Sequence, residues 1–109
     1  MAYHRRKLFA KLDRRLTADP CLRLKQLAHD LGVERHTIEN IVRETKGKSF
    51  RKFQKGKLLR KALRVLMKES DKSIKEIAVA LGYASSEPFS RFVKTHTGRT
   101  PTQIRKDPN

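Results

Sequence analysis

Two segments of this 109-residue chain repeat each other 50 residues apart, and the repeat limits the possible folds more than any other feature. The segment LKQLAHDLG at 24–32 matches IKEIAVALG at 74–82. Each copy then runs through a second apolar-periodic stretch to another glycine, Gly47 or Gly98, which a basic residue and a hydroxyl side chain follow. A repeat in so short a chain indicates that the same structural motif occurs twice.

Apolar residues recur at helical spacing along the whole chain, as Leu8, Leu12 and Leu16 do near its start, and no stretch alternates as a strand does. We therefore expect an all-α fold of about seven helices. The predicted helices span 3–18, 24–31, 35–46, 49–69, 73–81 and 85–96, and a short last helix begins after Thr100. Ser49, Ser85 and Thr100 are expected to cap the helices that they precede.

The longest predicted helix carries four cations at helical spacing, Lys57, Lys61, Arg64 and Lys68, which predict a basic stripe. Gly56 lies inside the same helix, where it costs about 1 kcal/mol relative to Ala. Either the close approach of another helix or a simple weak spot accounts for this glycine.

A short helix, a sharp turn at glycine and a second helix predict a helix-turn-helix. Ala28 and Ala78 supply the small residue that the crossing of the two helices needs, and Gly32 and Gly82 allow the turn. We therefore expect two helix-turn-helix subdomains joined by a long linker helix. The expected organisation is one domain over 1–109, with lobes over 3–46 and 73–107 and the linker over 49–69.

The net charge of +16 comes from 27 basic and 11 acidic residues, divided evenly between the two halves of the chain. The electric field of so large a positive charge attracts polyanions over long distances. No stretch approaches the roughly 18 apolar residues of a membrane span, so we expect no membrane partner. Cys21 is the only cysteine, which excludes an internal disulfide and fits a reducing cytoplasm. The four histidines do not cluster at ligand spacing, so we expect no metal, no cofactor and no catalysis.

The second copy resembles the C-terminal signature of the AraC/XylS transcription regulators. The matching residues are Ile77-Ala78, Gly82-Tyr83, Phe89-Ser90-Arg91, Lys94, Gly98, Thr100-Pro101 and Arg105. The paired glycines lie 15 residues apart in the first copy and 16 in the second, an asymmetry that the family shares. The resemblance covers about 8–106 and implies a bacterial DNA-binding domain that acts as an activator and contacts RNA polymerase.

The chain departs from the family pattern at several positions. Val93 stands where Phe is usual, and Leu58 lies near a common Arg of the linker. Glu34 and Glu39 place acids at the front of the second helix of the first helix-turn-helix.

Recognition helices present outward residues near their N-terminus to base edges in the major groove. The expected base-contacting residues are Arg35, His36, Glu39, Asn40, Ser86, Glu87, Ser90 and Arg91. The expected phosphate-contacting residues are Arg43, Lys48, Ser49, Arg51, Lys52, Lys94, Arg99, Thr100 and Arg105. For Arg91 the alternative is an ion pair with Glu87 one turn earlier.

The linker helix of roughly 20 residues spans about 30 Å, close to the roughly 34 Å between successive major grooves on one side of B-DNA. The partner expected on these grounds is double-stranded DNA, bound by a monomer in the cytoplasm. A basic RNA-binding or ribosome-associated protein is the alternative, but aromatic residues are only 6% of the chain. A third alternative is the DNA-binding part of a bifunctional repair enzyme.

Overall fold

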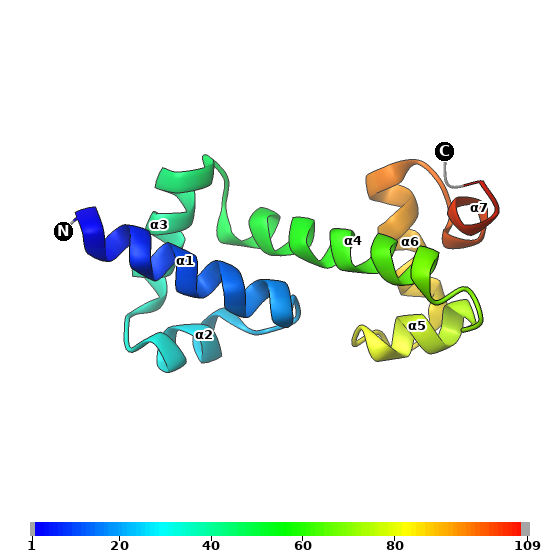
Figure 1. Ribbon diagram of the computed structural model, residues 1–109, viewed down its shortest axis with the longest axis horizontal. Helices are drawn as coiled ribbons and strands as arrows, with labels where there is room; N and C mark the ends of the chain where they lie inside the picture. The colour runs from blue at the N-terminus through cyan, green and yellow to red at the C-terminus, as the bar shows by residue number, and fades with distance from the viewer. Residues whose placement is uncertain (1, 108–109) are drawn as a thin grey trace. The chain divides into compact units, whose positions relative to one another are not determined.

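The computed structural model describes residues 2–107, and only the backbone of residues 2–4. The described residues form seven α-helices and no strand (Figure 1), which confirms the expected all-α fold. The helices are α1 (Ala2–Ala18), α2 (Leu24–Leu31), α3 (Arg35–Lys46), α4 (Phe50–Lys68), α5 (Ile74–Ala80), α6 (Ser86–Thr97) and α7 (Pro101–Lys106). They divide into unit 1, up to Leu58, and unit 2, from Leu59, so that α4 contributes residues to both.

Unit 1 is a bundle in which α1 packs against α2 and α3, and the start of α4 completes the core. Leu12 and Leu16, one helical turn apart on α1, are fully buried. Burying a leucine side chain stabilises a fold by about 1.5–3 kcal/mol, so the apolar stripe of α1 is a main source of stability. The core consists of Leu12, Leu16, Leu27, Ala28, Ile38, Ile41, Val42, Phe50 and Phe53.

One ion pair joins α1 to each of the other three helices of unit 1. The pairs are Arg15–Asp30 to α2, Arg5–Glu44 to α3 and Asp13–Lys57 to α4. Asp30 also accepts a hydrogen bond of 2.8 Å from the Gln26 amide. This bond, together with the Arg15 guanidinium, holds the pKa of Asp30 below its ordinary value.

Lys57 does not belong to an exposed basic stripe, contrary to the prediction. Its side chain is only 11% exposed, and its Nζ pairs with Asp13 and donates to the Thr17 hydroxyl at 2.9 Å. The same nitrogen lies 5.5 Å from the centroid of the Phe53 ring. Lys57 therefore ties α4 to α1 within unit 1.

Unit 2 consists of the second half of α4 with α5, α6 and α7, the same order of helices along the chain as α1, α2, α3 and the start of α4 in unit 1. Ala62 and Leu66 of α4 are fully buried, together with residues of α5, α6 and α7. The other buried residues of this unit are Ile77, Ala78, Leu81, Phe89, Val93, Pro101 and Ile104.

The two helix-turn-helix turns share the same backbone bonds. The turn glycine has a positive φ, 68° in the first copy and 95° in the second, where a side chain would be strained. The N–H that follows it donates to the alanine carbonyl four residues before the glycine, from Val33 to Ala28 and from Tyr83 to Ala78, at 3.0 Å in both copies. The expected role of both glycines is confirmed.

The helix starts agree with the sequence in two cases and differ in one. Ser49 accepts a hydrogen bond of 3.2 Å from the Lys52 N–H, and Thr100 forms a capping box with Gln103. Ser85 occupies the N-cap of α6, but its side chain makes no capping hydrogen bond. At Gly56 an added Cβ would meet no atom within 4 Å, so this glycine is a weak spot of α4 and no close packing requires it.

Candidate nucleic-acid interface

Helix α3 has one buried and one exposed face. Ile38, Ile41 and Val42 hold it against the core of unit 1. All of the predicted contact residues on this helix are exposed, namely Arg35, His36, Glu39, Asn40 and Arg43. The buried residues therefore fix the rotation of α3, and this rotation presents the predicted residues together to the solvent.

Helix α6 follows the same rotation when the copies are aligned on their second glycines. Phe89 and Val93 take the positions of Ile38 and Val42 and are fully buried. The residues that take the positions of His36, Asn40 and Arg43 are exposed, namely Glu87, Arg91 and Lys94. Ser86 and Ser90 are half-buried at the margin of this face. The second interface is thus formed mainly by one acid and two cations.

Each exposed face carries a basic side chain that contacts an acidic side chain close to it in the sequence. His36 Nδ1 lies 3.3 Å from the Glu34 carboxylate, and an Arg91 nitrogen lies 3.6 Å from the Glu87 carboxylate. The four side chains are at least 68% exposed, so each pair contributes about 0–1 kcal/mol at most. Contacts this weak leave both basic side chains able to exchange partners.

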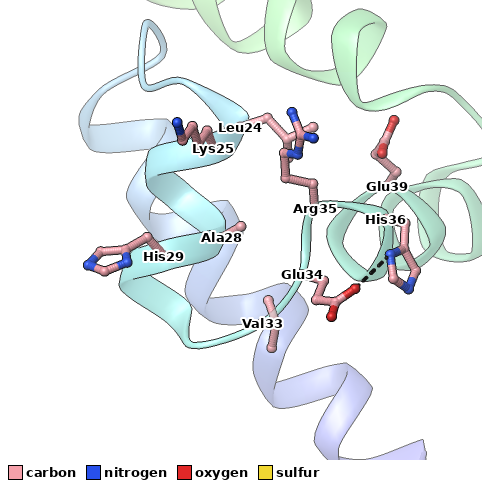
Figure 2. A pocket seen from close by; sticks show the side chains of 9 residues that line it. All are labelled: Leu24, Lys25, Ala28, His29, Val33, Glu34, Arg35, His36 and Glu39. Atoms are coloured by element: carbon pink, nitrogen blue, oxygen red, sulfur yellow. Dashed lines mark ion pairs between the residues drawn. The ribbon is translucent and has the colours of Figure 1, made fainter.

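A hollow of about 670 Å³ lies between α2 and α3, beside the predicted contact residues (Figure 2). Leu24, Ala28 and Val33 give it apolar walls. In Figure 2 the Arg35 side chain extends toward the start of α2, and Glu39 projects from α3 on the far side. The hollow therefore combines apolar surface with charges of both signs, and it opens on the exposed face of α3.

The turns that follow the two recognition helices are held differently. In unit 2 the Thr97 hydroxyl lies 2.8 Å from the Val93 carbonyl oxygen and accepts a bond of 3.2 Å from the Arg99 N–H. Lys46 stands at the matching position in unit 1, where a hydroxyl is absent. The second turn is consequently the more firmly fixed of the two.

Most of the predicted phosphate contacts are accessible. Arg43, Lys48, Arg51, Lys52 and Lys94 are exposed, whereas Ser49, Arg99 and Thr100 are half-buried.

Arg105 is engaged within the protein instead of extending freely to the solvent. Its guanidinium donates to the backbone carbonyls of Leu66, Glu69 and Lys72, at 3.2, 3.1 and 2.7 Å. These bonds use three of the five N–H donors of the guanidinium and engage each of its three nitrogens. The structure therefore assigns Arg105 an internal role that sequence reasoning missed.

Two searches of the described part of the chain found nothing. The described side chains, those of residues 5–107, contain no group of three or more His, Cys, Asp or Glu placed to hold a metal ion. Among the same residues, no helix has the length and apolar character that crossing a membrane requires.

Comparisons with known proteins agree with this architecture. A family model described as a helix-turn-helix domain matches residues 27–107. A probable transcription factor of Proteus vulgaris, PqrA, is 26% identical over 96 residues, which are 88% of this chain and 78% of that protein.

Solved structures are similar over nearly the whole chain. A transcriptional regulator with an AraC-type DNA-binding domain from Chromobacterium violaceum superposes with a TM-score of 0.81 at 25% identity, over 95% of this chain and 96% of that one. The C-terminal domain of AraT, a response regulator from Geobacillus stearothermophilus, has the same fold, with a TM-score of 0.74 at 24% identity over 94% of this chain and 83% of that one.

Proposed function

The chain belongs to the AraC/XylS family of helix-turn-helix DNA-binding domains, and from that membership we propose that it is a sequence-specific transcription regulator that binds double-stranded DNA. The observation that carries the proposal is the pair of helices α3 and α6. Buried residues at matching positions hold both helices, whereas the exposed residues of the two differ. Such an arrangement suits the recognition of two unlike half-sites by one protein.

The exposed side chains suggest a base preference for each half-site. In unit 1, Arg35 donates to guanine, Asn40 pairs with adenine, and Glu39 accepts from cytosine N4. In unit 2, Arg91 makes a bidentate contact to guanine, for which its guanidinium leaves the weak ion pair with Glu87. His36, Ser86 and Ser90 complete the base-contacting set.

Phosphate contacts supply the sequence-independent part of the affinity. We assign these contacts to basic and hydroxyl residues of α3 and α6, of the turns that follow them and of the start of α4. The proposed set is Arg43, Lys48, Ser49, Arg51, Lys52, Lys94, Arg99 and Thr100. With a net charge of +16, the affinity should fall steeply as salt is added.

A monomer is sufficient for two half-sites. Helix α4 has 19 residues, and a helix of that length spans about 28 Å. Successive major grooves on one side of B-DNA lie roughly 34 Å apart. We infer that α3 and α6 enter successive grooves, and that the protein acts in the bacterial cytoplasm as an activator that contacts RNA polymerase. The activator role and the contact with RNA polymerase rest on family membership alone.

Selection of bound sequences from random duplex DNA tests this proposal. The wild-type protein should enrich one asymmetric motif. Asn40→Ala should relax one half of that motif and Arg91→Ala the other, each with a loss of about 1–3 kcal/mol of discrimination. Lys52→Ala is the matched control, because the loss of a phosphate contact lowers affinity for all sequences alike.

Two outcomes would contradict the proposal. An unchanged motif for both Asn40→Ala and Arg91→Ala would mean that the base-contacting residues are wrong. Equal binding of RNA and duplex DNA, without any enriched motif, would instead favour a general RNA-binding protein.

A further inference from the structure

The bonds of Arg105 have a counterpart in the other half of the chain. When the copies are aligned on Gly47 and Gly98, position 54 in unit 1 corresponds to position 105 in unit 2. The Gln54 side-chain amide donates to the backbone carbonyl of Leu22, as Arg105 donates to that of Lys72. Both carbonyls belong to the second residue before the first helix of a helix-turn-helix, α2 in one case and α5 in the other. The same connection is therefore made twice.

We propose that Gln54 and Arg105 are positioning residues that fasten the helix after each recognition helix to the loop that enters the same helix-turn-helix. The recognition helix lies between the two fastened segments along the chain. The turn that follows the recognition helix, Lys48–Ser49 in unit 1 or Arg99–Thr100 in unit 2, is thereby held at a fixed position beside that helix. The effect on DNA rests on the function proposed above, whereas the fastening itself does not.

The different strength of the two connections follows from the helices that they hold. Helix α7 has six residues, and a helix far shorter than about 12–15 residues is not stable without tertiary contacts. Only Pro101 and Ile104 anchor it in the core. Three bonds from Arg105 to carbonyls at and beyond the end of α4 supply the further tertiary contacts that α7 needs. The positive charge of Arg105 also suits the negative end of the α4 helix dipole.

Helix α4 needs less support at its start. It has 19 residues, and Phe50 and Phe53 of its first turns are buried in the core of unit 1. One neutral bond from Gln54 therefore suffices. Arg105 should consequently matter more for DNA binding than Gln54 does, although it touches neither a base nor a phosphate.

Hydrogen exchange and DNA binding of Arg105 variants test the proposal. Arg105→Met removes every donor, whereas Arg105→Gln keeps one donor and resembles the residue that unit 1 uses. We expect the Ile104 and Asp107 amides of Arg105→Met to exchange about tenfold faster or more, and those of Arg105→Gln to show a smaller increase. Lys106→Met is the matched control, because it removes an exposed neighbouring charge and should leave both amides unchanged.

On the selected duplex, Arg105→Met should weaken binding by about tenfold, and Arg105→Gln by less. If Arg105 acts by placing Arg99, then the double variant Arg99→Ala/Arg105→Met should bind no more weakly than the weaker of its two single variants. Gln54→Met should produce a smaller loss than Arg105→Met.

Several results would overturn the proposal. Arg105 would contact a phosphate directly if Arg105→Gln and Arg105→Met lost equal affinity for the duplex, and if these losses added to the loss caused by Arg99→Ala. Faster exchange with unchanged affinity would reduce Arg105 to a scaffold residue without influence on DNA. If the wild-type protein failed to bind duplex DNA, the proposed function would fall, while unchanged exchange in Arg105→Met would separately refute the fastening.

Discussion

Loss of the Asp13 carboxylate should destabilise unit 1 much more than loss of its partner's charge at Lys57. The two ends of this ion pair differ in exposure, since the Lys57 side chain is 11% exposed and that of Asp13 is 39% exposed. In Asp13→Ala the ammonium of this largely buried side chain loses its counterion and keeps the Thr17 hydroxyl as a hydrogen-bond partner. In Lys57→Met the carboxylate that remains is still solvated.

The size of the effect follows from this difference. Removal of one partner of a fully buried pair costs about 3–5 kcal/mol, and an exposed pair is worth about 0–1 kcal/mol. Because Asp13 is partly exposed, the cost of breaking this pair lies between the values for a buried and an exposed pair. The better helix propensity of Ala offsets roughly 0.5 kcal/mol of that cost. We therefore expect Asp13→Ala to lose about 2 kcal/mol and Lys57→Met to lose less than about 1 kcal/mol, because Met keeps the apolar stem beside Phe53.

Urea unfolding followed by circular dichroism measures these free energies. The double variant Asp13→Ala/Lys57→Met is the decisive comparison, because it removes the stranded charge. It should be more stable than Asp13→Ala alone by about 1 kcal/mol. If the double variant were instead the least stable of the three, or if Asp13→Ala lost no more than Lys57→Met, the role given to the burial of Lys57 would be refuted.

Three further predictions concern other parts of the chain. Gly56→Ala should raise the free energy of unfolding by about 0.5–1 kcal/mol, because it improves helix propensity without a clash; a loss in urea unfolding would contradict this. Glu87→Gln should strengthen DNA binding about two- to fivefold by removing a charge that repels phosphate and competes for Arg91; weaker binding in a fluorescence titration would indicate that Glu87 itself contacts a base. The pKa of Glu76 is held below its ordinary value by hydrogen bonds from the backbone and then the side chain of Ser73, so this carboxylate stabilises the fold above its unfolded-state pKa and loses that effect as the pH falls through its lower folded-state pKa. Ser73→Ala removes the side-chain bond and keeps the backbone N–H, so NMR titration should show the Glu76 pKa moving part of the way up, and an unmoved pKa would exclude the Ser73 hydroxyl as a cause.

The scaffold was predictable because its signals are local. Gly32 and Gly82 are identified by a repeated pattern, and both have the positive φ that such a turn requires. The apolar periods of α3 and α6 place Ile38 and Phe89 in the two cores. Periodicity also indicates which side of a recognition helix is exposed, so the positions of the candidate contact residues followed from the same reasoning.

The connections between helices were not predictable in this way. Lys57 has the spacing of a stripe of surface cations, and only the position of Asp13 on another helix explains its burial. Arg105 matched a phosphate contact by analogy, but its partners are carbonyls more than thirty residues away in the chain. Gln54 carried one signal that sequence reasoning did not use, namely its place in the repeat opposite Arg105.

Helix α1 shows that sequence similarity and the folded unit have different limits. The family match begins at residue 27, after α1 has ended at Ala18. Yet α1 supplies Leu12 and Leu16 to the core, and it holds the partners of Asp30, Glu44 and Lys57. A fragment trimmed to the matched residues would expose an apolar surface and leave three charges without their counterions. The smallest part of this protein that can be excised as a working module, or fused to another protein, therefore includes a helix that the family pattern does not cover.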